Sequence, residues 1–435
     1  FPILLGTFFQ QLYNTIDSVI VGQFVGKEAL AAVGGSSAQI VAFVVGFFTG
    51  LSSGASVTIA QFFGAKDSRS ANKGLHTAYA IAAFGGLILT VSGIILTPFL
   101  LEMMNTPADI VADSAVYLRI YFAGIIFVLI YNMGSAILRA TGDSKRPLYY
   151  LIVCCIINIV LDVLFVIVFH MGVMGVAVAT LIAQAVSAVL VTLKLMRSEG
   201  ILKLSVKQIR FHGSILKMQL KLGLPTGFEA ILFSITNIAI QSAVNTFGTD
   251  TTAAWSAYGK LDAIFWMVST AFGIAITTFV GQNYGAGKMD RVRKSTRVCL
   301  LMDFIVSAVL VVFLIAARFL LFRLFTNDSH VIEIGCDMLV LITPWYIVYV
   351  FIEVIAGALR GVGNVVVPVA ITLLGVCVLR IAWLAAMLKI SPTISAIILS
   401  YPVTWVITAL AFIIYYIYIT HKTIAGSSKK HVPKL

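Results

Sequence analysis

The chain has 435 residues, of which 60% are hydrophobic and only 11% are charged, and its mean hydropathy is +1.01. A soluble domain of this composition would have too few polar side chains to cover its surface, so a soluble enzyme or soluble binding module is excluded. The net charge of +12 would suit a nucleic-acid partner, but the positions of the basic residues indicate membrane topology instead.

Apolar runs of about 20 residues recur along the chain, which is the length that crosses a hydrocarbon core roughly 30 Å thick. Their unbroken character favours helices over the alternating strands of a barrel. The sequence therefore predicts an all-α polytopic membrane protein. Twelve spans are expected, near 1–25, 36–63, 75–99, 114–138, 148–170, 173–196, 219–246, 254–284, 297–324, 334–359, 366–388 and 394–419. Because the chain begins inside an apolar run, we expect the native N-terminus to precede Phe1.

The first expected span carries polar residues on one helical face, among them Tyr13, Asn14 and Asp17. The span 148–170 carries Asn158 and Asp162, one turn apart. Each acid lies about eight residues, or ~12 Å, from the expected outer end of its helix. Two carboxyl groups are therefore expected at one depth in the membrane, where an acid indicates a functional site.

Other polar residues of the first half lie in neighbouring spans. Thr180 is expected at a similar depth in the span 173–196, whereas Asn132 lies deeper in the span 114–138. The oxygen atoms of such a set could hold a proton or ligate a hard cation such as Na⁺, and the sequence does not decide between them. The structural alternative is that the acids bond neighbouring helices or pair with Arg119.

The second half carries different acids. Glu229 lies in the span 219–246 and Glu353 in the span 334–359, and both are candidates for binding a cationic substrate or a second coupling ion. Lys260 and Asp262 are interpreted as a polar patch within one helix near the outer surface. Arg139 and Arg360 are interpreted as residues that shape cytoplasmic turns.

Two motifs recur at the same offset of 221 residues, which indicates an internal duplication. QFFGA at 61–65 matches QNYGA at 282–286, and LRATGDSKRP at 138–147 matches LRGVGNVVVP at 359–368. Six spans per half give two bundles of the same orientation, the architecture of an alternating-access transporter. The expected organisation is an N-lobe at 1–196, a cytoplasmic linker at 197–218, a C-lobe at 219–419 and a cytoplasmic tail at 420–435.

Lysine and arginine gather in alternate loops, so both termini are expected in the cytoplasm. The opposite loops hold only Lys27, Arg318, Arg323 and Lys389. The five cysteines show no ligand spacing and are interpreted as core residues, so neither a structural metal nor a disulfide framework is expected. No Gly-x-x-x-x-Gly-Lys-[Ser/Thr] motif occurs, which leaves an ion gradient as the driver of active transport. The sequence shows no nucleophile–base constellation of the kind that would indicate an enzyme.

Segments quoted from the whole chain, including LYNTIDSVIVGQFVGKEALAAVG at 12–34 and the motif at 138–147, resemble the multidrug and toxic compound extrusion (MATE) family. The likeness is greatest to its prokaryotic, DNA-damage-inducible-type branch. The resemblance implies two six-helix lobes and a cation-coupled antiporter. It assigns N-lobe coupling to the set Tyr13, Asp17, Asn132, Asn158, Asp162 and Thr180. In another branch of the family, the C-lobe uses an acid that matches Glu229, together with an Asp on the tenth helix. Near the position of that Asp this chain has Tyr349, one turn before Glu353.

The combined expectation is an exporter of amphipathic, cationic small molecules in exchange for H⁺ or Na⁺. It would act as a monomer in the inner membrane of a prokaryote, surrounded by the lipid bilayer. Neither a nucleic-acid partner nor a cofactor other than the coupling ion is expected. That ion could be Na⁺, bound at Asp17 and Asp162. The alternative within the same superfold is a flippase for lipid-linked precursors, which would need a strongly cationic cavity for pyrophosphate.

Overall fold

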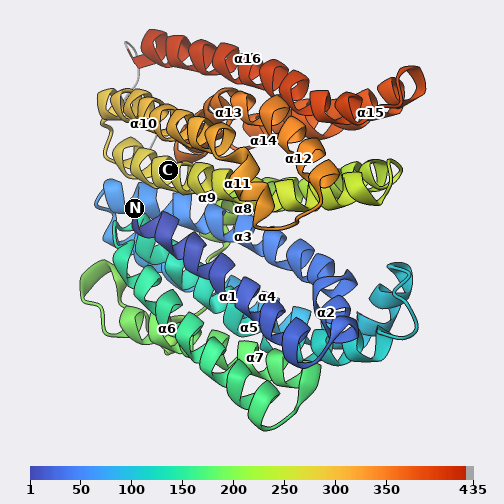
Figure 1. The fold of residues 1–435 in the computed structure, drawn as a ribbon. Helices are drawn as coiled ribbons and strands as arrows, with labels where there is room; N and C mark the ends of the chain where they lie inside the picture. The colour runs from blue at the N-terminus through green and yellow to red at the C-terminus, as the bar shows by residue number, and fades with distance from the viewer. Residues whose placement is uncertain (428–435) are drawn as a thin grey trace. The chain divides into compact units, whose positions relative to one another are not determined.

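The computed structural model describes residues 1–427, apart from the side chains of Ile201 and of residues 421–427, and all its regular elements are helical (Figure 1). Residues 428–435, which are half of the expected tail at 420–435, lie outside the described residues. Contacts divide the chain into two compact units, unit 1 (Phe1–Gly227) and unit 2 (Phe228–Leu435).

The elements that begin in unit 1 are α1 (Pro2–Phe24), α2 (Lys27–Gly34), α3 (Ser36–Gly64), α4 (Ser68–Met103), α5 (Val111–Ala140), α6 (Lys145–Asp162), the π-helix η1 (Val163–Val168), α7 (Gly172–Met196), the 3₁₀ turns η2 (Gly200–Leu202) and η3 (Val206–Gln208), and α8 (Gly213–Asn245), which ends in unit 2. Unit 2 continues with α9 (Thr249–Gly285), α10 (Met289–Ala316), α11 (Arg318–Arg323), α12 (Ser329–Ile342), the 3₁₀ turn η4 (Thr343–Trp345), α13 (Tyr346–Gly361), α14 (Val366–Thr372), the π-helix η5 (Leu373–Val378), α15 (Leu379–Ile390) and α16 (Ile394–Ser427).

Eleven helical segments of the described residues are long and apolar enough to cross a membrane, and they follow the second to twelfth expected spans in order. The helix α1 is 23 residues long but falls below the hydropathy of the others, because Gln10, Gln11, Asn14 and Asp17 interrupt its apolar sequence. Several helices extend beyond the expected spans: α4 begins at Ser68 and α10 at Met289. Their first turns carry basic residues, which are good helix formers and can face water.

The sequence predicts a linker at 197–218 and a C-lobe that begins at residue 219, whereas the division between the units falls further along α8, after Gly227. The beginning of α8 packs on unit 1. A side chain at Gly50 or Gly54 of α3 would overlap the backbone at Gly227 or Gly223 of α8. Gln219 Nε2 also donates to the carbonyl oxygen of Gly74 in α4 at 2.9 Å. These contacts place the first part of α8 with unit 1.

The duplicated motif encodes the same turn in both halves. The helix α5 ends before Gly142 (φ 96°), and α13 ends before Gly363 (φ 88°). In each turn the glycine N–H donates to the carbonyl oxygen of an arginine, Arg139 or Arg360, at 2.9 Å. A positive φ favours glycine, so the recurring Arg-x-x-Gly pattern reflects a backbone requirement.

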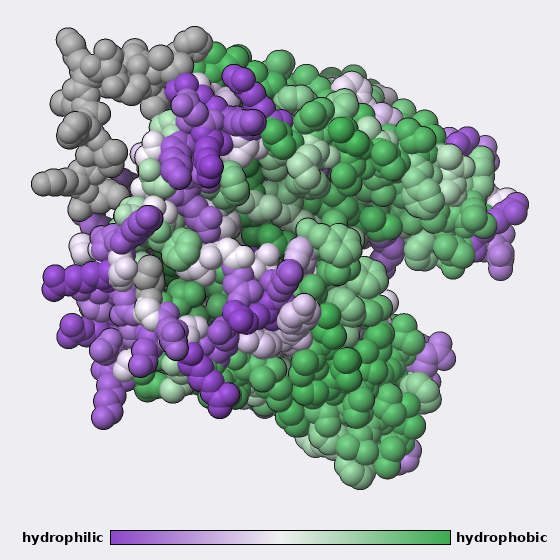
Figure 2. Space-filling model, turned by 90° about the vertical axis from the view of Figure 1, so that its left-hand side faces the viewer, coloured by the Kyte–Doolittle hydropathy of each residue, from purple (hydrophilic) through white to green (hydrophobic). Residues whose placement is uncertain are grey.

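Large apolar side chains remain exposed on the flanks of the helices, for example Ile95 (69%), Val309 (65%) and Val312 (67%). In the face that Figure 2 shows, hydrophobic surface covers the flanks of the helices and hydrophilic residues gather towards their ends. Exposed apolar surface of this extent is expected to contact lipid. The chain is therefore a multi-pass membrane protein. All five cysteines are free and buried, as expected for core residues.

Asp67 fixes the start of α4, because its Oδ1 accepts from the Ser70 N–H at 3.0 Å. This hydrogen bond holds the pKa of the Asp67 carboxyl below its ordinary value. The ionised cap therefore contributes its full stability above the ordinary carboxyl pKa of about 4 and loses it as the pH falls through the lower folded-state value. Asp67→Ala should destabilise the start of α4 by about 1 kcal/mol at neutral pH, measured by amide hydrogen exchange of Ser70.

Asp67→Asn is the control, since asparagine also caps helices but does not titrate. It should retain slow exchange at neutral pH and lose the acid sensitivity. Equal exchange in wild type and Asp67→Ala would contradict the assigned cap.

Candidate functional site

The two acids predicted at one depth meet inside unit 1. Asp17 lies on α1 and is 8% exposed, whereas Asp162 is the last residue of α6 and is fully buried. The two carboxyl groups lie close enough to interact electrostatically, where α1 packs against α6. Two ionised carboxylates this close repel each other where water is scarce, so a proton or a cation bound at the pair would relieve the repulsion. The arrangement is a pair of buried carboxyl groups between α1 and α6 that can bind a proton.

A π-helical segment follows Asp162 directly, η1, and contacts α1. The Phe169 N–H donates to the carbonyl oxygen of Leu164, five residues earlier, at 3.0 Å. Such segments often occur at functional sites, because they alter the direction of side chains along an otherwise regular helix. The expected helix over 148–170 did not include this irregularity.

Polar neighbours surround the carboxyl pair. Asn158 Nδ2 donates to Thr180 Oγ1 at 3.5 Å, and Gln184 Nε2 donates to Tyr13 Oη at 3.4 Å. Three buried side chains of this group have oxygen atoms without a hydrogen-bond partner among the described residues. These atoms are Asp17 Oδ1, both Asp162 oxygens and Asn158 Oδ1. Free oxygen acceptors suit a proton or a hard cation.

Not every predicted member of the set joins this group. Asn132 is half-buried on α5 and makes no hydrogen bond to these residues in the part of the chain that the structure describes. Arg119 is exposed, and the ion pairs of the described residues do not include it. The alternative in which the acids pair with Arg119 is therefore wrong.

Two tyrosines of α5 belong near the pair and were not predicted. Tyr117 and Tyr121 stack with ring centroids 6.2 Å apart. Tyr117 lies close enough to Asp17 and Asp162 to interact electrostatically with both, and Tyr121 interacts in this way with Tyr13. Their spacing of four residues places them on one helix face, a signal that the sequence contained.

In unit 2, Glu353 forms an ion pair with Arg360, in which the Nη2 and Oε1 atoms are 3.3 Å apart. Arg360 therefore does more than shape a turn, and the earlier interpretation is corrected: seven residues separate the two, which is two turns of α13. Both residues act electrostatically on Glu229 of α8. The two predicted acids thus share one guanidinium group.

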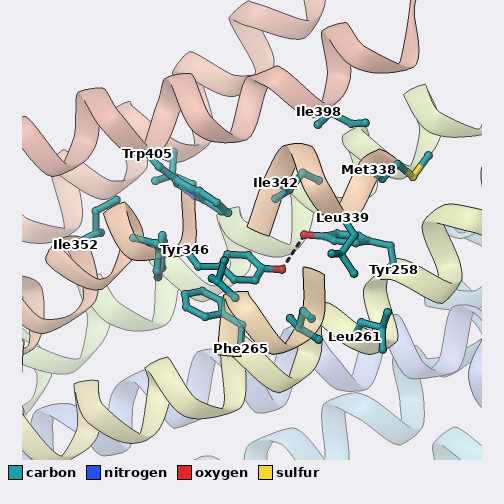
Figure 3. Close-up of a cluster of buried hydrophobic side chains, with 14 of the residues drawn as sticks. Tyr258, Leu261, Phe265, Met338, Leu339, Ile342, Tyr346, Ile352, Ile398 and Trp405 are labelled. Carbon is teal, nitrogen blue, oxygen red and sulfur yellow. Dashed lines mark hydrogen bonds between the residues drawn. The ribbon is translucent and has the colours of Figure 1, made fainter. Parts of the chain in front are cut away.

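Asp262 was interpreted as part of an intrahelical patch with Lys260, and the structure corrects this. Lys260 is exposed, whereas Asp262 bonds across to another helix. Tyr346 Oη of α13 donates to its Oδ1 at 2.5 Å, and Trp266 Nε1 donates to its Oδ2 at 2.7 Å. Figure 3 shows Tyr346 beside Tyr258, with their hydroxyl oxygens 2.9 Å apart. These hydrogen bonds hold Asp262 among the aromatic side chains in the core of unit 2.

The described residues contain no group of three or more His, Cys, Asp or Glu side chains that could hold a metal ion. The family model MatE matches residues 2–164 and 225–384, once in each half of the duplication.

The chain belongs to the MATE family. It is 30% identical to the probable multidrug resistance protein YoeA of Bacillus subtilis over 86% of this chain and 82% of that protein. It is 28% identical to the probable multidrug resistance protein NorM of Thermotoga maritima, over 87% of this chain and 82% of the relative.

The fold is that of solved MATE structures. A crystal structure of MATE in the bent conformation superposes with a TM-score of 0.92, covering 99% of this chain and 95% of that chain at 20% identity. The predicted all-α architecture of two six-helix bundles is confirmed, as is the resemblance to the MATE family.

Proposed function

We propose that this MATE protein is a secondary active antiporter that exports amphipathic, cationic small molecules in exchange for H⁺ or Na⁺. The observation that carries the proposal is the closeness of two buried acids, Asp17 on α1 and Asp162 on α6, where these helices pack against each other. The names of the bacterial relatives, which are multidrug resistance proteins, support a drug-like substrate. The protein would transport rather than catalyse.

The carboxyl pair supplies a mechanism for coupling. When both acids are ionised, like charges repel each other across the packing of α1 against α6, and the repulsion is strong where water is scarce. A proton or Na⁺ bound from the outside would remove this repulsion and let the helices close. This change in packing would favour release of the substrate, and loss of the ion to the cytoplasm would reset the protein.

The remaining expectations belong to the same proposal. The protein would work as a monomer in a prokaryotic inner membrane with both termini in the cytoplasm, without a cofactor or a nucleic-acid partner. Glu229 and Glu353 would meet the positive charge of the substrate in unit 2, since each is an acid within a membrane-spanning segment.

The test is efflux of a permanently cationic, ethidium-type dye from proteoliposomes that contain the purified protein. Dye should leave against its gradient when either a pH gradient or a Na⁺ gradient is imposed, and the effective gradient identifies the coupling ion. Vesicles without protein give the background. Absence of gradient-dependent dye transport under both conditions would contradict the proposal and favour the flippase alternative.

A further inference from the structure

A third acid of unit 2 lies in one of its most apolar helices. Asp303 belongs to α10, whose candidate span has a mean hydropathy of 2.9. Its neighbours Met302, Phe304 and Ile305 are exposed on the flank of the helix, whereas Asp303 itself has no exposed surface. The side chain is therefore directed into unit 2 and away from lipid. No expectation from the sequence included it.

The hydrogen bonding of Asp303 is incomplete for an ionised group. Ser307 Oγ donates to Oδ1 at 3.2 Å, while Oδ2 is buried and has no partner among the described residues. An unpaired carboxylate inside a membrane is strongly unfavourable, so such a group is stabilised when it binds a proton or a counter-charge. No basic side chain forms an ion pair with it in the part of the chain that the structure describes.

The surroundings of Asp303 add negative charge. The helix α10 packs against α9 and α13. From α13, Glu353 acts electrostatically on Asp303, and on α10 itself Cys299 lies near it. On α9, Gly273 lies against Glu353, and a Cβ atom added at Gly273 would overlap the Glu353 carboxyl group.

Glu353 therefore acts electrostatically on two other acids of unit 2, Glu229 and Asp303. Arg360 is bonded to Glu353 and also interacts with Glu229, and this leaves Asp303 without a cation of its own. A proton on Oδ2 is the smallest neutralising group and needs no cavity.

We propose that Asp303 is a proton-binding residue of unit 2, which holds its proton on Oδ2 and releases it when a cationic substrate brings further positive charge to Glu353, beside Arg360. A positive charge at Glu353 offsets the negative charge that an ionised Asp303 adds to the group. Binding of an organic cation is then exchanged locally for a proton, independently of the Asp17–Asp162 pair. The exchange step rests on the proposed antiport function, whereas the protonation of Asp303 does not.

Infrared spectroscopy of the purified full-length protein at neutral pH tests the protonation. The spectrum of wild type minus Asp303→Asn should contain a C=O stretching band of a protonated carboxylic acid that shifts in D₂O. Asp303→Glu keeps a carboxyl group and should therefore retain such a band at a changed frequency. This second variant keeps the test decisive if Asp303→Asn fails to fold. Asp290→Asn, which removes an exposed acid from the same helix, should lose no such band. Coincident spectra of wild type and Asp303→Asn in this region would overturn the proposal.

Two further measurements test the link to Glu353. Glu353→Gln should shift the frequency of the Asp303 band, and an unchanged band would show that the two groups do not interact. Addition of the cationic dye to weakly buffered wild-type protein should release protons. The Asp303→Asn variant should release one proton fewer than the wild type for each dye molecule that binds. Equal release would overturn the exchange step. Failure of dye transport in vesicles would refute the antiport function and leave the infrared result to decide the protonation.

Discussion

Replacing Asp17 with asparagine should reduce gradient-driven dye efflux to the background of vesicles without protein. Asparagine preserves the size of the side chain but cannot ionise, so the pair with Asp162 can no longer bind and release an ion. The packing of α1 against α6 should survive, because the substitution removes a charge from the interior and adds no volume. The measurement is initial efflux in proteoliposomes under the gradient that drives the wild type.

Asp162→Asn should have the same effect, since the two acids act as one site. Asp109→Asn is the matched control, because this acid is exposed and belongs to the same unit. It should transport at the wild-type rate. Undiminished gradient-driven efflux in Asp17→Asn, at an equal amount of reconstituted protein, would refute the assignment of the coupling site.

Replacing Gly54 with leucine should destabilise unit 1 more than any substitution on a lipid-facing flank. The Cβ atom alone would overlap the backbone of Gln219 and Gly223, where α3 and α8 approach each other. Backbone cannot rotate away as a side chain can, so the helices must separate. We expect a loss of at least about 1–3 kcal/mol, measured as a lower midpoint of thermal unfolding in detergent.

Gly34→Leu is the control for this substitution. Gly34 ends α2, and a Cβ atom there would meet nothing within 4 Å. The control should unfold close to the wild-type temperature. If Gly54→Leu unfolded at the same temperature as Gly34→Leu, the close contact between α3 and α8 would not contribute to stability.

Much of the fold was predictable because the length of an apolar run indicates directly whether that segment can cross a membrane. Eleven of the twelve expected spans reappear as long apolar helices, and the recurring motif at 138–147 and 359–368 marks the same glycine turn in both halves. The ends of the helices were less predictable. Basic first turns continue α4 and α10 beyond the apolar run, and hydropathy cannot detect helix outside the membrane.

The candidate site was predictable where depth alone decides proximity. Asp17 and Asp162 were expected at one level of the membrane and do meet. The prediction failed where the direction of a side chain decides. Asp262 was predicted to form a polar patch with Lys260 within one helix near the outer surface, yet residues two apart point to different sides of a helix. Asp303 was overlooked because it is isolated in sequence, and its neighbour Glu353 comes from α13.

By itself the sequence determined that this chain crosses the membrane repeatedly, in two related halves, with acids in segments where acids are costly. These properties follow from composition, run length and repetition, which are local to the chain. Only the tertiary structure decided which acids lie close together: Asp17 with Asp162 in unit 1, and Glu353 with Glu229 and Asp303 in unit 2. Helix rotation and packing set these partnerships, because a carboxyl group interacts strongly only with the few groups within several ångströms of it.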